Sequence, residues 1–66
     1  MVLTKDLSKH GLKKGDIGTI VHVHPGSGYE VEFVTLGGDT VAVVSLKDSD
    51  IRLTAKREIP HVRAVA

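Results

Sequence analysis

Residues 11–24 restrict this chain to a β structure more than any other stretch does. A polar turn at residues 14–16 leads into residues 17–23, a run rich in β-branched side chains with the length of one strand. The run contains one glycine, Gly18, and a glycine inside a strand pattern indicates a β-bulge or a close approach of another backbone. We therefore expect a strand that bends at Gly18, with further strands beside it.

The rest of the chain predicts four more short strands. Tyr29, Val31 and Phe33 alternate with two glutamates, which is typical of a half-buried antiparallel strand. Residues 25–28 and 36–39 carry turn residues, and residues 47–50 predict a single 3₁₀ turn. The expected strands are residues 2–5, 17–23, 29–33, 40–46 and 51–54. The expected core is Leu3, Ile17, Ile20, Val23, Val31, Phe33, Val43, Ile51 and Leu53.

Five short strands, tight turns and a long loop over residues 6–16 predict an all-β fold, a small five-stranded SH3-like barrel. The barrel would span residues 1–54, and residues 55–66 would form a short C-terminal tail. An OB-fold is the main alternative, but it needs longer strands and usually a helix, for which the chain has no room.

The composition limits the function classes. The 66 residues make one domain near the lower size limit for folding, and the absence of cysteine excludes disulfides and thiolate zinc sites. Nine Lys and Arg are interspersed with eight Asp and Glu, so no basic stripe for a phosphate backbone is present. No apolar run approaches the ~20 residues of a membrane span, and the N-terminus lacks signal-peptide order. We expect a cytoplasmic protein without membrane contact.

The sequence Gly-Leu-Lys-Lys-Gly-Asp-Ile-Gly-Thr-Ile-Val-His-Val at residues 11–23 is followed by Tyr-Glu-Val-Glu-Phe at residues 29–33. Thr-Val-Ala-Val-Val at residues 40–44 and Asp-Ile-Arg at residues 50–52 complete a pattern that resembles the bacterial family domain of unknown function 4926. The resemblance covers roughly residues 2–54. It implies a small accessory or partner-binding protein, in some members an antitoxin-like partner of a neighbouring toxin.

Two looser resemblances point to the same fold. Residues 18–21 with residues 29–33 are similar to the small SH3-like barrels of photosystem I, which are non-catalytic docking proteins. Residues 15–21 are similar to part of a KOW motif.

His22 and His24 are the residues that suggest a metal. They lie two apart in a strand and thus on one face, about 6.5–7 Å apart along it. With His10 or His61 they could start a zinc or nickel site, or they could sense pH, since their unperturbed pKa is about 6.5. Exposed strand histidines explain the pattern more simply, so we predict no metal and no cofactor.

Catalytic patterns have little support. No serine lies in a Gly-x-Ser-x-Gly elbow, and Gly26 to Gly28 leads into a strand instead of a helix N-terminus that could bind phosphate. Glu30 and Glu32 share one strand face, where a solvated surface accounts for them. The protein is predicted not to be an enzyme.

The favoured function is a non-enzymatic protein–protein interaction module, an adapter or accessory protein, present as a monomer or weak homodimer. The predicted partner-binding residues lie in the loop and tail: Lys9, His10, Lys13, Lys14, Lys56, Arg57 and Arg63. One alternative is an antitoxin-like inhibitor of a neighbouring enzyme. The other is weak nucleic-acid binding through Lys9, Lys13, Lys14 and Arg52. Nucleic acid is the less favoured partner, because one Tyr and one Phe offer few stacking platforms.

The tail combines basic residues with Ile59 and Val62 as possible anchors. A segment this poor in apolar residues can become ordered on a partner, or it can dock on its own domain. The first possibility predicts that removal of residues 55–66 leaves the barrel folded and weakens partner binding.

Overall fold

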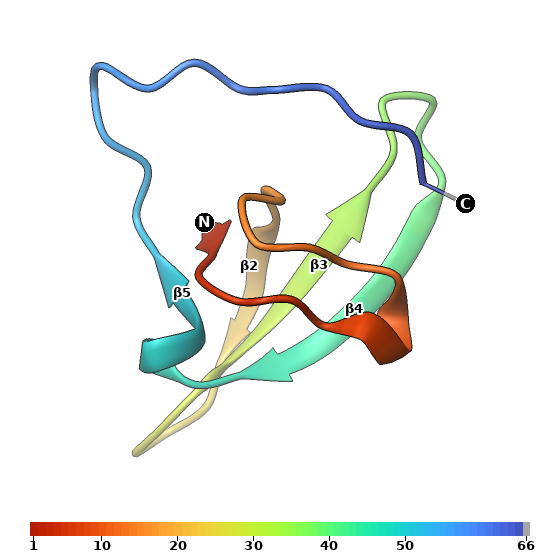
Figure 1. The fold of residues 1–66 in the computed structure, drawn as a ribbon. Coiled ribbons are helices and arrows are strands. Elements are labelled where there is room, and N and C mark those ends of the chain that lie inside the picture. The colour runs from red at the N-terminus through yellow and green to blue at the C-terminus, as the bar shows by residue number, and fades with distance from the viewer. Residues whose placement is uncertain (66) are drawn as a thin grey trace.

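The computed structural model describes residues 1–65 and contains five strands and two 3₁₀ helices (Figure 1). In chain order the elements are β1 (Val2–Leu3), η1 (Ser8–His10), β2 (Thr19–Val23), β3 (Tyr29–Val34), β4 (Thr40–Leu46), η2 (Asp48–Asp50) and β5 (Ile51–Arg52). Residues 1–65 contain no α-helix, so the predicted all-β class is confirmed. In the same residues, no helix has the length and apolar character needed to cross a membrane.

The strands form two sheets instead of the single closed barrel that the sequence predicts. β2, β3 and β4 make an antiparallel meander, and β1 pairs antiparallel with β5 (Figure 1). A bridge between Val2 and Ile17 and a hydrogen bond from the Leu3 N–H to the Asp16 carbonyl (2.9 Å) connect the two sheets. Because β1 and β5 are only two residues long, they cannot extend these contacts into a continuous ladder.

Gly18 lies just before β2, at a close approach to the neighbouring strand. A Cβ at this position would lie 2.6 Å from Val31 Cγ1 and 2.8 Å from Phe33 Cε1. The register of β2 on β3 shifts later, between Ile20 and His22. The chain therefore has both features that a glycine here indicates, a close approach and a bulge, but the bulge follows the glycine.

The core lies between the two sheets and includes one residue of the long loop, Leu12. Its buried residues form one contiguous cluster: Leu3, Leu12, Val31, Phe33, Leu46 and Ile51. Four of these, Leu3, Val31, Phe33 and Ile51, were predicted from the sequence. Ile20, also predicted, packs against the cluster and is partly buried.

Four predicted core residues are instead exposed: Ile17, Val23, Val43 and Leu53. Val43 faces away because the ladder places Ala42 opposite Phe33, and residues opposite each other share a face. Val23 is opposite Tyr29, on the same face as Val31, but it is the last residue of β2 and lies beyond the buried cluster. Ile17 precedes β2, where the strand alternation does not yet apply, and Leu53 follows the end of β5, where it no longer does.

Candidate functional site

The loop of residues 6–16 is closed by its own hydrogen bonds. The Leu7 and Leu12 backbones exchange N–H to carbonyl bonds of 2.9 and 3.1 Å, and between them η1 ends at Gly11 in the left-handed conformation, with φ 68°. The Lys14 N–H donates to Asp6 Oδ1 at 2.8 Å. These bonds, with Leu12 in the core, give the loop a defined shape.

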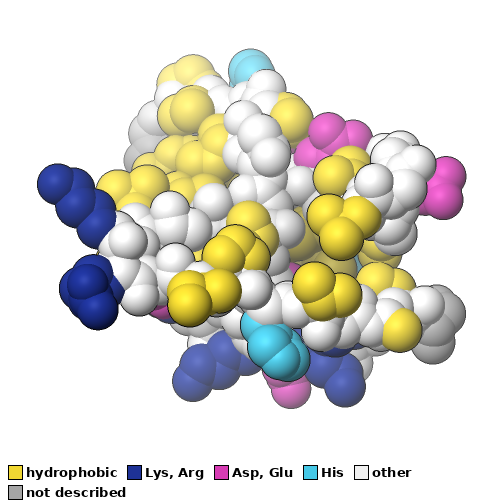
Figure 2. All heavy atoms as spheres, turned by 90° about the horizontal axis from the view of Figure 1, so that it is seen from above, with side chains coloured by type: hydrophobic (Ala, Val, Ile, Leu, Met, Phe, Trp, Pro, Cys, Tyr) yellow, Lys and Arg dark blue, Asp and Glu magenta, His cyan; other side chains and the backbone are white. Residues whose placement is uncertain are grey.

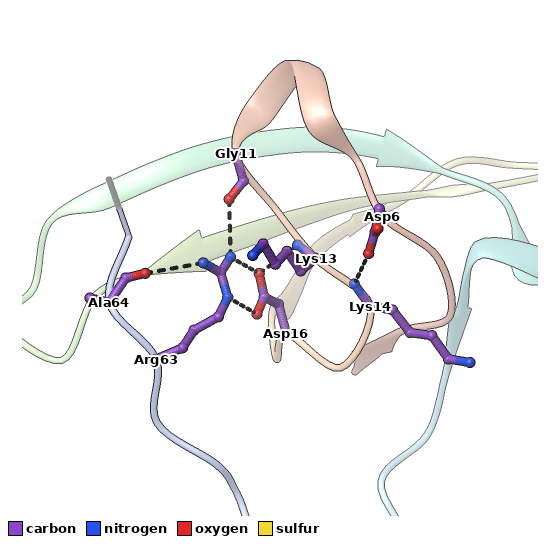
Figure 3. A network of polar contacts seen from close by, with 7 residues as sticks. All are labelled: Asp6, Gly11, Lys13, Lys14, Asp16, Arg63 and Ala64. Atoms are coloured by element: carbon purple, nitrogen blue, oxygen red, sulfur yellow. Dashed lines mark hydrogen bonds and ion pairs between the residues drawn. The ribbon is translucent and has the colours of Figure 1, made fainter.

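Asp16, at the end of this loop, binds an arginine from the other end of the chain (Figure 3). Arg63 Nε donates to Asp16 Oδ1 at 2.7 Å, and Arg63 Nη2 donates to Asp16 Oδ2 at 2.5 Å. The same Nη2 donates to the Gly11 carbonyl at 3.0 Å. The carboxylate side chain is 18% exposed and the arginine side chain 28%. A two-pronged bond of this kind fixes both the position and the orientation of the guanidinium.

The pair holds the Asp16 carboxylate in its charged form. The hydrogen bond from Arg63 is the largest cause that lowers the pKa of Asp16, and the Lys13 N–H, which donates to Oδ2 at 2.9 Å, lowers it further. Partial burial acts in the opposite direction but does not prevail. Asp16 in turn raises the pKa of Arg63, with a smaller contribution from the charge of Asp6. Both groups are thus ionised at neutral pH.

A second ion pair tethers the start of the C-terminal segment, residues 53–65. Arg52 donates from Nη1 and Nη2 to the two Glu58 carboxylate oxygens at 2.8 and 2.6 Å. The Ala55 N–H also donates to Glu58, at 2.7 Å, which closes a turn. The Arg52 guanidinium, assisted by this N–H, lowers the pKa of Glu58 to about 2. The segment is therefore held at two points, Glu58 and Arg63.

Between the C-terminal segment and the three-stranded sheet lies a cavity of about 420 Å³, which we call the strap cavity. Its walls come from four parts of the chain: the loop with Leu12 and Asp16, the end of β3 with the turn that follows it (residues 33–36), Val41 of β4, and residues 60–65. Figure 2 views the molecule from the side of the C-terminal segment and shows hydrophobic side chains gathered across this face. The cavity therefore combines a largely apolar lining with the Asp16–Arg63 ion pair and His61.

Several large apolar side chains on this face are exposed to solvent. Leu36, in the turn between β3 and β4, is 95% exposed, and Val34 before it is 52% exposed. On the C-terminal segment, Ile59 is 89% and Val62 74% exposed. Leu36, Val34 and Val62 line the strap cavity, so these three exposed residues and the cavity form one surface, and Ile59 lies just before the lining residues 60–65.

The predicted partner-binding residues divide into three places. Lys13 and Lys14 precede Asp16 in the loop, where the Lys13 N–H donates to Asp16 and the Lys14 N–H to Asp6, and the Lys14 side chain points away from Asp16 (Figure 3). Lys9 and His10 line a different, smaller cavity of about 270 Å³ beside β4. Lys56 and Arg57 lie exposed in the turn at Glu58, whereas Arg63 points inward to Asp16. The structure thus brings Lys13 and Arg63 together at Asp16 and places the other five elsewhere.

The sequence interpretation named Val62 as a possible anchor but missed Leu36 and the acceptor role of Asp16. The sequence Gly15-Asp16 predicts a turn, and the Lys13 N–H bond to Asp16 fits that prediction. The second role of Asp16 depends on Arg63, which is 47 positions away, and no local pattern indicates that pairing. The exposure of Leu36 could not be predicted either, because an exposed leucine in a turn has no sequence signature.

His22 and His24 lie on one face, as predicted, with ring centroids 5.2 Å apart in an edge-to-face arrangement. His24 Nε2 lies 3.0 Å from Glu30 Oε2, and the Ser45 hydroxyl donates to the same oxygen. The Ser45 bond, then His24, lowers the pKa of Glu30. Across residues 1–65, no three His, Cys, Asp or Glu side chains are grouped to hold a metal ion.

Comparisons with known proteins bear on the strands and the loop. No curated protein and no solved structure matches the chain significantly. One family model, described as Domain of unknown function (DUF4926), matches residues 1–53, a range that includes all five strands, the loop and Asp16 but not Arg63. Because the match covers well over half of the chain, the protein belongs to the family Domain of unknown function (DUF4926).

Proposed function

We propose that the protein is a non-enzymatic protein–protein interaction module that binds its partner at the face of the strap cavity. The observation that supports this best is the set of exposed apolar side chains that line the cavity, with Leu36 95%, Val62 74% and Val34 52% exposed. Exposed apolar residues that lie together, unlike scattered ones, mark interaction sites.

The Asp16 carboxylate at the cavity also suits binding more than catalysis. A general acid or base works best with a pKa near the operating pH. Asp16 is the carboxylate that lines the cavity, and Arg63 holds its pKa below the ordinary value. A permanently ionised, hydrogen-bonded carboxylate can orient a cationic group but is poorly matched to proton transfer.

The proposal includes an SH3-like arrangement of the strands and a role as a bacterial, cytoplasmic accessory protein. Five short strands, a long first loop and a 3₁₀ turn before the last strand support the arrangement. In scaffolds of this kind, rigid strands position the loops that bind. Here the rigid part is the β2–β3–β4 sheet, and the binding part is the loop, the β3–β4 turn and the C-terminal segment.

Site-specific photo-crosslinking in the protein's own cells tests the proposal. A photoreactive residue replaces Leu36 in one variant and Ser27 in a control. Ser27 is also exposed but lies in the turn before β3, whereas Leu36 lies in the turn after it. We expect a discrete protein adduct from position 36 that excess untagged protein abolishes, and no such adduct from position 27. Equal adducts at both positions, or none at 36, would overturn the proposal.

An antitoxin-like inhibitor is one form that such a module could take. If the captured partner is an enzyme, its activity measured with and without this protein decides the matter: inhibition at stoichiometric amounts supports the antitoxin form, and unchanged activity supports an adapter. Nucleic-acid binding is less favoured, because Arg52, one of its proposed contacts, is paired with Glu58. A gel shift at low salt tests it.

A further inference from the structure

We infer that Asp16 and the Gly11 carbonyl form a recognition site for an arginine side chain in an extended, apolar segment of a partner protein. The protein's own residues 59–65 occupy this site in cis. The inference rests on the proposed function and specifies the chemistry of the partner.

The acceptor groups are placed by the loop and not by the C-terminal segment. Asp16 Oδ2 accepts the Lys13 N–H at 2.9 Å, and the Asp16 carbonyl accepts the Leu3 N–H at 2.9 Å. Gly11 is fixed by its N–H bond to the Ser8 carbonyl (3.2 Å), and Leu12 beside it is 3% exposed. All these contacts lie within residues 3–16. The site therefore keeps its shape when Arg63 leaves.

The arrangement of acceptors matches a guanidinium in particular. Two carboxylate oxygens and one carbonyl accept bonds of 2.7, 2.5 and 3.0 Å from Nε and Nη2 of a single arginine. A planar fork can reach all three at once, whereas the ammonium of a lysine is a compact point charge without fixed donor directions. The site should therefore distinguish arginine from lysine.

The C-terminal segment fits the site loosely on its apolar side. With the segment in place, a cavity of about 420 Å³ remains between it and the floor of Leu12, Phe33 and Val41. Val62, next to the bound arginine, is 74% exposed and so gains little by burial. A segment that makes the same ion pair and carries larger apolar side chains would bury more surface. A partner segment of this kind could therefore displace the protein's own C-terminal segment.

When the protein's own C-terminal segment occupies the arginine site, the apparent affinity of that site for a partner is weaker. A short flexible connection presents its ligand at an effective concentration of about millimolar. The apparent affinity for a competing segment falls in proportion to the fraction of molecules whose site is free. Releasing the C-terminal segment should strengthen binding of such a partner. The sequence alone predicts the opposite, because it does not show that this segment occupies the loop.

A peptide titration with the full-length protein tests the inference. The probe is a fluorescent peptide with the sequence of residues 59–65, and binding is followed by anisotropy. We expect Arg63→Gln, which releases the segment, to bind the peptide at least about tenfold more tightly than the wild type, as if one site in ten were free in the latter. Arg57→Gln, which changes an exposed arginine of the same segment, should bind like the wild type.

Two further measurements isolate the recognition chemistry. The reference is the affinity of the arginine peptide for the Arg63→Gln protein. A peptide with Arg63→Lys should bind that protein at least about tenfold more weakly, because it lacks the planar guanidinium. The arginine peptide should likewise bind at least about tenfold more weakly to the protein that carries both Asp16→Asn and Arg63→Gln. Thermal melting confirms that each variant is folded. Chemical-shift changes on peptide addition to Arg63→Gln should centre on Gly11, Asp16 and Phe33, which gives a readout that does not depend on the Asp16 variant.

The inference is overturned if folded Arg63→Gln does not bind the peptide at millimolar concentration, or binds it no more tightly than the wild type does. Equal affinity for the arginine and lysine peptides also overturns it. These outcomes are separate from the crosslinking at Leu36. A partner captured there without peptide binding refutes the arginine site and leaves the interaction module standing. Peptide binding without capture shows that the loop binds arginine but refutes the partner-binding face at Leu36.

Discussion

Gly18 occupies a point where the chain passes too close to β3 to carry any side chain. A Cβ there would meet Val31 at 2.6 Å, Phe33 at 2.8 Å and the Glu32 carbonyl at 3.0 Å. The Gly18 N–H also donates to the Met1 carbonyl at 2.9 Å, so the backbone cannot move away without breaking the contact to the N-terminus. This one position joins the N-terminus to the three-stranded sheet.

We predict that Gly18→Ala destabilises the protein by about 1–3 kcal/mol, the usual cost of overpacking a core. Gly37→Ala is the matched control, because a Cβ at Gly37 meets nothing closer than Thr35 Oγ1 at 3.8 Å. The control should change the free energy of unfolding by less than about 0.5 kcal/mol. Urea unfolding followed by circular dichroism measures both. Equal effects of the two substitutions would contradict the close approach at Gly18.

The Asp16–Arg63 pair should make the stability of the fold depend on pH. The folded-state pKa of Asp16 is lowered from the ordinary value of 3.8, chiefly by Arg63. The stabilisation from this pair is therefore present above that value and is lost as the pH falls through the lowered pKa. We expect Arg63→Gln to raise the pKa of Asp16 relative to the wild type in a carboxyl NMR titration. Lys56→Gln, an exposed cation of the same segment, should leave it unchanged. An unchanged Asp16 pKa in Arg63→Gln would show that the pair does not form in solution.

At the scale of elements, local chemistry accounts for what the sequence predicts well. The turns after β2 and β3, the 3₁₀ turn before β5 and the alternation in β3 all depend on neighbouring residues, and all are present. The face of β4 is different, because β-branched residues fill both faces of that strand. Only the pairing of Ala42 with Phe33 decides which face is buried, and that pairing is not a local property.

β4 offers a direct test of this register. Leu46 is 4% exposed and Val43 is 52% exposed in the same strand. We predict that Leu46→Ala costs about 2–5 kcal/mol, as for other buried leucines. Val43→Ala should cost less than about 1 kcal/mol, within the range of strand propensities. Chemical unfolding of the two variants compares them. A larger loss for Val43→Ala would favour the register that the sequence alone predicts.

At the scale of the whole molecule, the candidate site depends on contacts between distant parts of the chain. The loop end, the β3–β4 turn and the C-terminal segment meet only because the folded strands bring them together (Figure 1). The sequence predicts the loop and the segment as binding elements, since both are basic and irregular. That Arg63 turns inward to Asp16, 47 positions away, depends on the complete fold and could not be predicted from spacing.

The measurement that tests the account most directly is the amide NMR spectrum of Arg63→Gln compared with that of the wild type. Arg63 fastens the C-terminal segment to a loop whose own hydrogen bonds hold the acceptors in place. We therefore expect shifted signals in residues 60–65 and at Leu12, Lys13 and Asp16, with the turn at residues 24–28 unchanged. Unchanged loop signals would show that the segment does not lie on the loop. Changes throughout the sheet would show that the loop is not preformed, and either result would contradict the account.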